Sequence, residues 1–190
     1  MSLALFQRWA AGDDAAFAAI YRQWHPRLVR FAAALTGDAA EGEDIAHDVF
    51  VRLSRNRLQL HRDGIQNSRA LLYAIVRRLA YNHFAHQQRW GSLAARAEEV
   101  RRVLLDAAAS SPEELAALAK VGVRIQRAMD ELPTRQRELV LLRHREHLSH
   151  EEIADVVGCT PSQVKARLNY ARRLLRDRLS EMGVVPGALP

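Results

Sequence analysis

Two helix-start signals follow each other closely near the C-terminal end and restrict what this chain can fold into. Residues 149–152 (Ser-His-Glu-Glu) and 160–163 (Thr-Pro-Ser-Gln) both have the form of a capping box. Gly158 lies between them, where it would end the first helix. The pattern predicts a short helix, a turn of about three residues and a longer second helix. Such a pair is a helix-turn-helix, whose second helix enters the major groove of DNA.

The second helix of this pair has two different faces. At about 100° per residue, one side collects the apolar residues Val164, Leu168, Ala171 and Leu175. The opposite side is mostly polar and basic, and carries Ser162, Lys165, Ala166, Asn169, Tyr170, Arg173 and Arg176. A solvated surface helix would show the same charges. The tight turn and the two capped starts favour a surface that reads DNA.

Helical periodicity in the first half of the chain predicts four helices. Apolar residues recur at helical spacing over four stretches, 17–24, 28–35, 45–53 and 72–79. Pro26 is expected to separate the first two as consecutive helices, and Gly37 to end the second. The polar stretch from Arg55 to Gln66, which contains Gly64, is expected to be a loop. About a dozen residues would precede the first helix.

A second domain is expected to begin after a polar, Arg-rich and Ala-rich segment. Ser111, Pro112 and Glu114 have the residue types of a capped helix start. A break at Leu132-Pro133 would then separate this helix from the next. The predicted organisation is a first domain at 1–90, a linker at 91–110, a second domain at 111–182 and a tail at 183–190. The fold class is therefore all-α, with two small helical domains joined by a linker, the C-terminal one containing the helix-turn-helix.

The charge of the chain points to an anionic partner. It has 28 basic and 22 acidic residues, a net charge of +6 and a pI near 10.2, and every basic residue except Lys120 and Lys165 is Arg. The surplus lies in two blocks, residues 51–90 with 8 basic and 1 acidic, and residues 161–190 with 6 and 2. Arg presents a planar fork that suits phosphates and base edges. Two separate anion-binding faces are predicted.

The fourth helix of the first half adds aromatic rings to its cations. Arg77 and Arg78 share its polar side with Tyr81 and Phe84. Single-stranded nucleic acid stacks its bases on such rings and pairs its phosphates with Arg. The alternative is that both rings pack against the segment from Gln87 onward.

The third helix begins with the acidic residues Glu41, Glu43, Asp44 and Asp48. Carboxylates in a first turn favour the helix dipole, which is a sufficient structural explanation for most of them. Asp48 lies beyond that turn, beside Val49 and Phe50, so a protein-docking face is the alternative.

Several classes of protein are excluded or disfavoured. His150-Glu151 begins like a zinc-protease helix, but position 154 is Ala, and no phosphate loop, Cys-x-x-Cys or Gly-x-Ser-x-Gly occurs. We expect no enzyme activity, no cofactor and no metal, although His144, His147 and His150 lie near Cys159 in sequence. The single cysteine, with no secretory signal and no apolar stretch of about 20 residues, indicates a cytoplasmic location.

The chain resembles the extracytoplasmic-function (ECF) sigma factors, the promoter-specificity subunits of bacterial RNA polymerase. Motifs similar to the second sigma domain are 17–21 (FAAIY), 26–31 (PRLVRF), 35–38 (LTGD), 43–53 (EDIAHDVFVRL) and 72–77 (LYAIVR). Motifs similar to the fourth are 130–133 (DELP), 136–138 (QRE), 148–154 (LSHEEIA) and 164–172 (VKARLNYAR). The order and spacing of these motifs carry the resemblance over nearly the whole length.

The resemblance implies a role for each region. Asp44, Asp48 and Phe50 would dock on core RNA polymerase. The loop 55–66 and a fourth-helix set would hold the melted minus-ten strand, the set being Arg77, Arg78, Tyr81, Asn82 and Phe84. The last helix would read the minus-thirty-five duplex with Ser162, Gln163, Lys165, Ala166, Arg167, Asn169, Tyr170 and Arg173. An anti-sigma partner is also implied.

The chain departs from the usual family pattern at positions that matter for specificity. The family usually has Ser at the position of Ala166, Arg at that of Tyr170, often Asp at that of Asn82, and Gln at that of His47. Two rival hypotheses remain at this stage. One is a helix-turn-helix regulator that binds a palindromic duplex without polymerase. The other is a helical interaction or metal-sensing protein that uses the histidine cluster.

Overall fold

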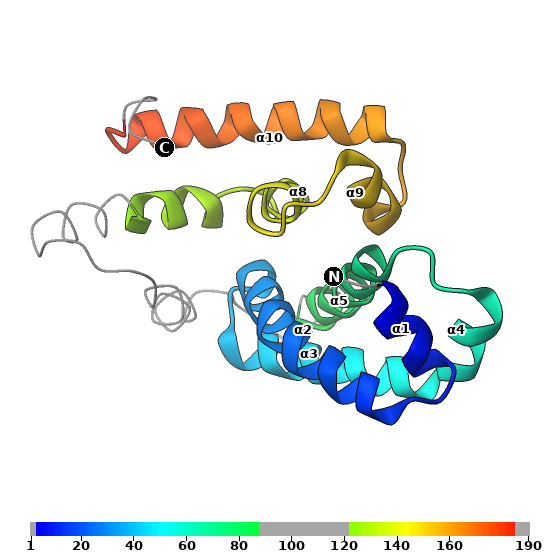
Figure 1. Ribbon diagram of the computed structural model, residues 1–190. Helices are drawn as coiled ribbons and strands as arrows, with labels where there is room; N and C mark the ends of the chain where they lie inside the picture. The colour runs from blue at the N-terminus through cyan, green and yellow to red at the C-terminus, as the bar shows by residue number, and fades with distance from the viewer. Residues whose placement is uncertain (1–2, 88–121, 185–190) are drawn as a thin grey trace, which may run out of the picture. The chain divides into compact units, whose positions relative to one another are not determined.

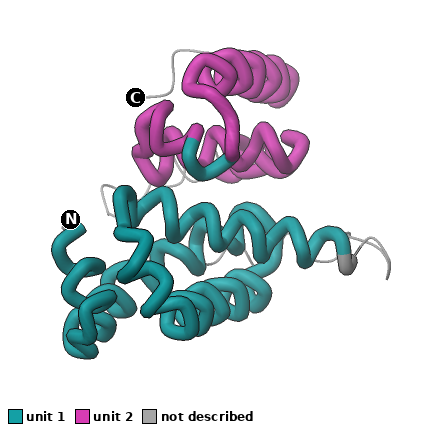
Figure 2. Tube along the Cα trace, turned by 90° about the vertical axis from the view of Figure 1, so that its right-hand side faces the viewer, with its two compact units in different colours: residues 1–100, 155–157 teal, residues 101–154, 158–190 magenta. Residues whose placement is uncertain are grey.

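The computed structural model describes residues 3–87 and 122–184, and the regular structure of this part is helical. The chain divides into two compact units, residues 1–100 with 155–157 and residues 101–154 with 158–190 (Figure 2). Residues 155–157 are the end of a helix whose start and caps belong to the second unit. The prediction of an all-α chain with two helical domains is confirmed. No helix in the described ranges is long and apolar enough to cross a membrane.

The first unit contains five helices in its described residues (Figure 1). They are α1 (Leu3–Ala10), α2 (Asp14–Thr36), α3 (Ala39–Arg55), α4 (Arg57–Asp63) and α5 (Ser68–Gln87). Helix α2 contacts α1, α3 and α5, so it is the centre of the unit. Its side chains Ile20, Leu28, Phe31 and Leu35 are fully buried, and Leu53, Leu72 and Val76 from α3 and α5 complete the core.

The prediction of two helices on either side of Pro26 is wrong, because α2 runs through the proline as one helix of 23 residues. A proline inside a helix removes one backbone hydrogen bond and costs about 3 kcal/mol in isolation. Here the ring is exposed, while Trp24 and Leu28 on either side of it are buried. Burial of these flanking side chains against the rest of the unit offsets the local cost.

Two helices were not expected from the sequence. Helix α1 occupies the residues that were expected to precede the first helix, and it buries Phe6 and Trp9, with the Trp9 ring 5.5 Å from that of Phe17. Helix α4 replaces the predicted loop between Arg55 and Gln66. It buries no residue, so it lacks the apolar periodicity that signals a helix.

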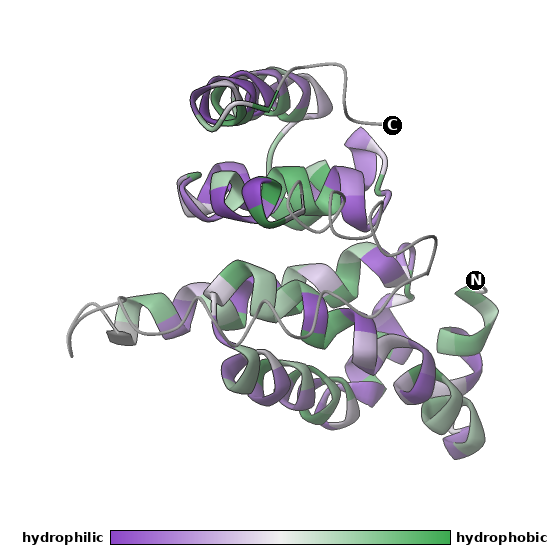
Figure 3. Cartoon of the chain, turned by 90° about the vertical axis from the view of Figure 1, so that its left-hand side faces the viewer, coloured by the Kyte–Doolittle hydropathy of each residue, from purple (hydrophilic) through white to green (hydrophobic). Residues whose placement is uncertain are grey.

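The second unit begins, in its described part, with a helix at residues 122–130. The break at Leu132-Pro133 follows as predicted, and then come α8 (Thr134–Val140), the π-helix η1 (Leu141–Arg145), α9 (His150–Val157) and α10 (Pro161–Glu181). One part of its core joins Ala128 to Leu179 and Val184 near the end of α10. Helix α10 carries both hydrophilic and hydrophobic residues, as expected of a helix with one buried side (Figure 3).

Some predictions fall where the structure gives no description. The helix start at Ser111, Pro112 and Glu114 and the linker 91–110 lie outside the described residues, as does the tail after Val184. The domain limits at residues 90, 111 and 182 therefore stay predictions.

Candidate nucleic-acid interface

Both capping boxes of the predicted helix-turn-helix are present in the structure. The Glu152 N–H donates to Ser149 Oγ at 3.1 Å, and the Ser149 N–H donates to Glu152 Oε2 at 2.8 Å. The Gln163 N–H donates to Thr160 Oγ1 at 3.2 Å, and the Thr160 N–H donates to Gln163 Oε1 at 3.0 Å. Each pair satisfies two N–H groups that a helix start leaves without partners. The helix-turn-helix prediction is confirmed at this level.

The turn between α9 and α10 depends on Gly158. Its backbone has φ +70°, in the left-handed region that glycine adopts without strain, and its N–H donates to the Ala154 carbonyl at 2.9 Å. Pro161 then occupies the first position of α10, where its missing N–H costs nothing. Both helices of the motif contribute side chains to the core, since Ile153 of α9 and Val164 of α10 are fully buried.

The side of α10 that was predicted to face DNA is solvent-exposed along its length. All eight predicted residues are exposed, namely Ser162, Gln163, Lys165, Ala166, Arg167, Asn169, Tyr170 and Arg173. Val164, Leu168 and Ala171 are buried on the other side, as the periodicity predicted. We call the exposed side the reader face. The capping bond to Thr160 fixes the orientation of the Gln163 side chain. Lys165 and Arg173 are exposed and take no part in the cap.

Arg172 and His144 add a contact that the sequence did not reveal. Arg172 Nε donates to His144 Nε2 at 3.4 Å, and Arg172 Nη1 lies 3.5 Å from Oδ1 of Asn169 on the reader face. Burial, followed by the positive charges of Arg172 and Arg143, lowers the pKa of the His144 imidazole. A neutral Nε2 is an acceptor, so this lowered pKa is consistent with the hydrogen bond. No sequence period links positions 144 and 172, because the contact depends on how two helices pack.

The segment that leads into α9 is held by backbone and side-chain bonds. η1 is a π-helix, and His147, two residues beyond its end, has φ +55°. Arg143 Nη1 donates to the Leu148 carbonyl at 2.7 Å, which ties η1 to the start of α9. His144, His147 and His150 do not form a metal-binding group with Cys159, and no group of three such ligands occurs anywhere in the described residues.

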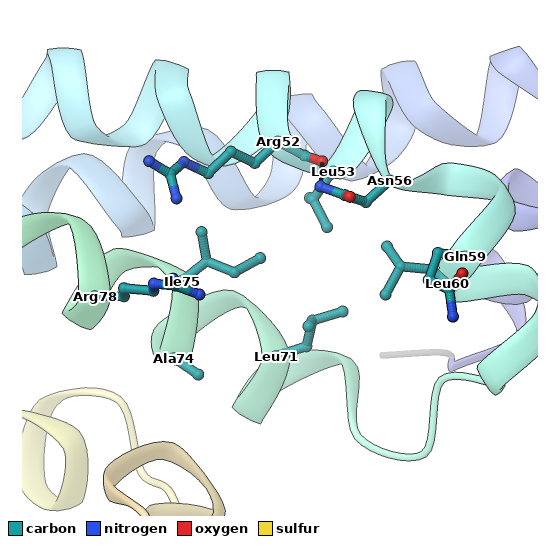
Figure 4. A pocket seen from close by; sticks show the side chains of 9 residues that line it. All are labelled: Arg52, Leu53, Asn56, Gln59, Leu60, Leu71, Ala74, Ile75 and Arg78. Carbon is teal, nitrogen blue, oxygen red and sulfur yellow. Dashed lines mark hydrogen bonds between the residues drawn. The ribbon is translucent and has the colours of Figure 1, made fainter.

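In the first unit, helices α3, α4 and α5 enclose a pocket of about 390 Å³ (Figure 4). Arg52 and Arg78 lie at one end of this pocket, and Gln59 and Leu60 lie at the other. The remaining lining side chains are Leu53, Asn56, Leu71, Ala74 and Ile75. The pocket therefore combines an apolar wall with two guanidinium groups and two amides. We call it the strand pocket.

The strand pocket includes residues that sequence reasoning missed. Arg52 on α3 was not singled out, and Asn56 and Gln59 were included only as part of the segment 55–66, which was expected to be a loop and not a helix end and a short helix. Gln59 Nε2 donates to both carboxylate oxygens of Asp63, at 2.8 and 2.9 Å, which holds its amide in place. Of the five residues predicted on α5, only Arg78 lines the pocket, together with Asn56, Gln59 and Leu60 from the segment 55–66 that was also expected to hold the strand.

The other predicted strand-binding residues form a separate cluster on α5. The Arg77 guanidinium lies over the Tyr81 ring, 4.8 Å from its centroid, and Phe84 meets that ring edge-on at 6.0 Å. All three are half-buried, whereas Asn82 is exposed. The sequence placed Arg77 and Arg78 on one polar side, but the structure assigns them to two different surroundings.

Asp44 and Asp48 of α3 lie on the surface, and Glu43 of the same helix contacts His25, a member of an aromatic cluster. Asp44 and Asp48 are exposed, but Phe50 is only 3% exposed. The Phe50 ring supports Tyr21, 4.7 Å away, and His25, 6.1 Å away. Phe50 thus shapes this surface from below and is not itself on it.

Comparison with known proteins agrees with this architecture. Residues 20–90 match the family model described as Sigma-70 region 2, and residues 122–175 match Sigma-70 region 4. ECF RNA polymerase sigma factor SigE of Mycolicibacterium smegmatis is 30% identical over 175 residues, which is 90% of this chain and 66% of that one. ECF RNA polymerase sigma factor SigL of Mycobacterium tuberculosis is 27% identical, over 92% and 95% of the two chains.

Other relatives extend the comparison. The probable RNA polymerase sigma factor RfaY of Xanthomonas campestris is 29% identical over 90% of this chain, which spans only 42% of that protein. Among solved structures, CnrH in complex with the cytosolic domain of CnrY has a TM-score of 0.67 at 22% identity, over 94% and 97% of the chains. RpoE of Bartonella quintana, in complex with the anti-sigma factor NepR, has a TM-score of 0.61 at 19% identity, over 86% and 96%.

A helix-turn-helix unit preceded by an all-helical unit, each matched by a Sigma-70 region, defines a sigma factor of the Sigma-70 class. Within that class, the chain belongs to the extracytoplasmic-function sigma factors.

Proposed function

We propose that this chain binds core RNA polymerase and directs it to promoters by reading two DNA elements in different states. The reader face of α10 recognises the minus-thirty-five element as duplex. The strand pocket and the α5 cluster hold the minus-ten element as a melted strand. The observation that carries the proposal is the presence, on two separate units, of a helix-turn-helix with an exposed second helix and of a base-sized pocket with two arginines at one end.

The duplex half of the proposal rests on the reader face. Ser162 and Lys165 lie in the first two turns of α10, the part of such a helix that reaches base edges. Asn169 follows one turn after Lys165, and its amide suits the donor and acceptor pair of adenine. Arg167 and Arg173 are placed to contact phosphates, which supplies affinity that falls with salt.

The strand half rests on the chemistry of the strand pocket. Its volume of about 390 Å³ fits a nucleobase with part of its sugar, and its apolar wall offers contact to a base removed from the stack. Asn56 and Gln59 supply amide groups for hydrogen bonds to the edge of the base. Arg52 and Arg78 at the other end are suited to the adjoining phosphates. Tyr81 and Phe84 would stack on neighbouring bases.

Docking on polymerase is assigned to the exposed side of α3. Asp44 and Asp48 provide negative charge there, and Tyr21, 36% exposed and supported by Phe50, provides an aromatic edge. Charged and aromatic side chains are both common in protein interfaces. The chain would act in the cytoplasm, with the polymerase, and would contribute recognition but no catalytic step.

An anti-sigma factor is proposed as a further partner. CnrH and RpoE, which share the fold, were solved with CnrY and with the anti-sigma factor NepR. The rival proposal, a helix-turn-helix regulator that works without polymerase, accounts for α10 but assigns no function to the strand pocket.

Run-off transcription with purified core polymerase tests the proposal. Core plus this chain is expected to yield transcripts from a defined start, and core alone is not. Arg78→Gln should reduce transcription from duplex templates, whereas Arg30→Gln, an exposed arginine of α2 that does not line the pocket, should leave it near normal. Specific duplex binding without core, with no transcription when core is added, would favour the regulator instead.

A further inference from the structure

Two side chains on the reader face differ from their neighbours because they present carbon rather than charge. Ala166 is exposed and ends in a methyl group, and Tyr170, one turn later, is 48% exposed. The described residues contain three exposed large hydrophobic side chains, the others being Tyr21 on α2 and Leu58 on α4. Of these three side chains, Tyr170 is the one that lies on the reader face of α10.

The surroundings of this pair identify the kind of partner. Positions 166, 170 and 173 are four and three residues apart, so they lie along one side of α10. The Arg173 guanidinium lies over the Tyr170 ring, 5.9 Å from its centroid, and Lys165 is exposed on the same face. An apolar protein surface would have to bury these cations without a partner, which is unfavourable. Duplex DNA supplies the phosphates that pair with them.

Base edges in the major groove offer one kind of apolar group, the C5 methyl of thymine. Alanine and aromatic side chains are suited to contact it. Ala166 is the sixth residue of α10, within the part that reaches base edges. Tyr170 lies about 6 Å further along the axis at 1.5 Å per residue. Base pairs are about 3.4 Å apart, so the two side chains reach positions no more than about two base pairs apart.

We propose that Ala166 and Tyr170 read thymine. The duplex element that this chain selects contains a thymine, or two close together, whose C5 methyl group packs against this pair. The inference rests on the proposed function, because it requires α10 to lie in the major groove. It adds a base identity and the two residues that determine it.

The test uses holoenzyme assembled from the full chain and core polymerase. Bound duplexes are selected from a library that is randomised in the upstream element. Each thymine of the selected element is then replaced by deoxyuridine, which removes the methyl group and keeps base pairing. We expect affinity to fall about fourfold at one or two positions, as for burial of one methyl-sized group. Deoxyuridine in the spacer between the elements should change nothing, and 5-methylcytosine, which keeps the methyl group, should retain part of the affinity.

Protein variants connect the effect to the two residues. Ala166→Ser and Tyr170→Gln should bind duplex but lose the difference between thymine and deoxyuridine. Ser180→Ala, an exposed change near the end of the same helix, should keep the full difference. Equal affinity for thymine and deoxyuridine at every position of a selected element overturns the thymine assignment. A difference that persists in both variants overturns it as well. Neither result contradicts the proposed function. A holoenzyme that selects no element overturns the proposed function and this inference with it.

Discussion

The guanidinium of Arg77 lies over the ring of Tyr81, 4.8 Å from its centroid, so one face of that ring already has a cationic partner. Phe84 meets the same ring edge-on. A melted base can therefore stack only on ring surface that Arg77 and Phe84 leave uncovered. Arg77 also holds the Tyr81 ring in place and offers a positive charge to a phosphate. Contacts of this kind are worth about 0.5–1 kcal/mol to the fold at exposed sites.

The first prediction concerns this cluster and strand opening. Tyr81→Ala with Phe84→Ala should leave binding to core and to the minus-thirty-five duplex near normal and should suppress open-complex formation. A stacked base is worth about 1–3 kcal/mol, so loss of the rings should cost roughly one to two orders of magnitude in open complex. Permanganate footprinting of unpaired thymines measures the outcome.

Tyr81→Phe is the matched control for that experiment. It keeps the ring under Arg77 and should open promoters like the unmodified chain. The same permanganate pattern in the double alanine variant would assign the two rings to packing within the protein. The strand pocket would then have to hold the melted strand without them.

The second prediction separates docking from folding on α3. Asp44 and Asp48 are exposed, so Asp44→Arg with Asp48→Arg should change the free energy of unfolding by less than about 0.5 kcal/mol for each site. Affinity for core polymerase should fall, because the charge of the proposed interface is reversed. Thermal unfolding and a binding titration with core measure the two effects. Normal core binding, or an unfolded variant, would remove these carboxylates from the interface.

Much of this architecture follows from local sequence, and the misses have a common cause. The capping boxes at Ser149 and Thr160 and the turn at Gly158 were predictable, because their chemistry lies within a few consecutive residues. The sequence predicted two helices at Pro26, because proline has a very low helix propensity. In the structure α2 is one helix, because packing along its whole length outweighs that local preference. Helix α4 carries almost no local signal, since it buries no side chain.

In the candidate site, too, features set by local sequence could be predicted and features set by packing could not. The exposed residues of α10 could be listed from the helical period alone, and they lie where the period placed them. The full lining of the strand pocket could not, because Arg52, Gln59 and Arg78 come to line one pocket only through the packing of three helices. Arg172 and His144 are likewise 28 residues apart in sequence. Roles assigned to single residues remain predictions for the experiments described here.

The third prediction is a pH dependence that arises from His144. Burial and the nearby Arg172 and Arg143 lower the pKa of this imidazole in the folded chain, so folding disfavours its charged form. The unfolded chain then binds more protons below the ordinary histidine pKa of about 6.5. This contribution to stability is complete above that pH and is lost as the pH falls through the folded-state pKa.

Thermal unfolding between pH 7.5 and 5.5 measures this effect. The melting temperature of the unmodified chain should fall on acidification by more than that of His144→Gln, which stays neutral and keeps an acceptor for Arg172. The other histidines are common to both proteins, so their contributions cancel in the comparison. Equal slopes would show that folding does not disfavour the charged form of His144.

The last prediction concerns Gly42, where α3 packs closely against α2. A Cβ atom at this position would lie 2.8 Å from Cβ and backbone N of Ala33 and 2.9 Å from the Val29 carbonyl oxygen. Two of these three atoms are backbone, so they yield only if α2 and α3 move apart. Alanine raises helix propensity by up to about 1 kcal/mol over glycine, but overpacking of this kind costs about 1–3 kcal/mol. Gly42→Ala should therefore destabilise the first unit, against the propensity scale.

The neighbours of Gly42 extend this effect to function. His83 Nδ1 lies 2.7 Å from Glu41 Oε1, and His25 Nε2 lies 3.5 Å from Glu43 Oε2, so α3 is fixed to α5 and α2 on either side of the glycine. A displaced α3 would move the proposed docking carboxylates together with Arg52 in the strand pocket. We expect Gly42→Ala to lower the melting temperature and to weaken both core binding and strand opening. Ala40→Gly, exposed on the same helix, should cost no more than about 1 kcal/mol and spare both activities. A Gly42→Ala chain that melts at or above the original temperature would show that α2 and α3 separate there without cost.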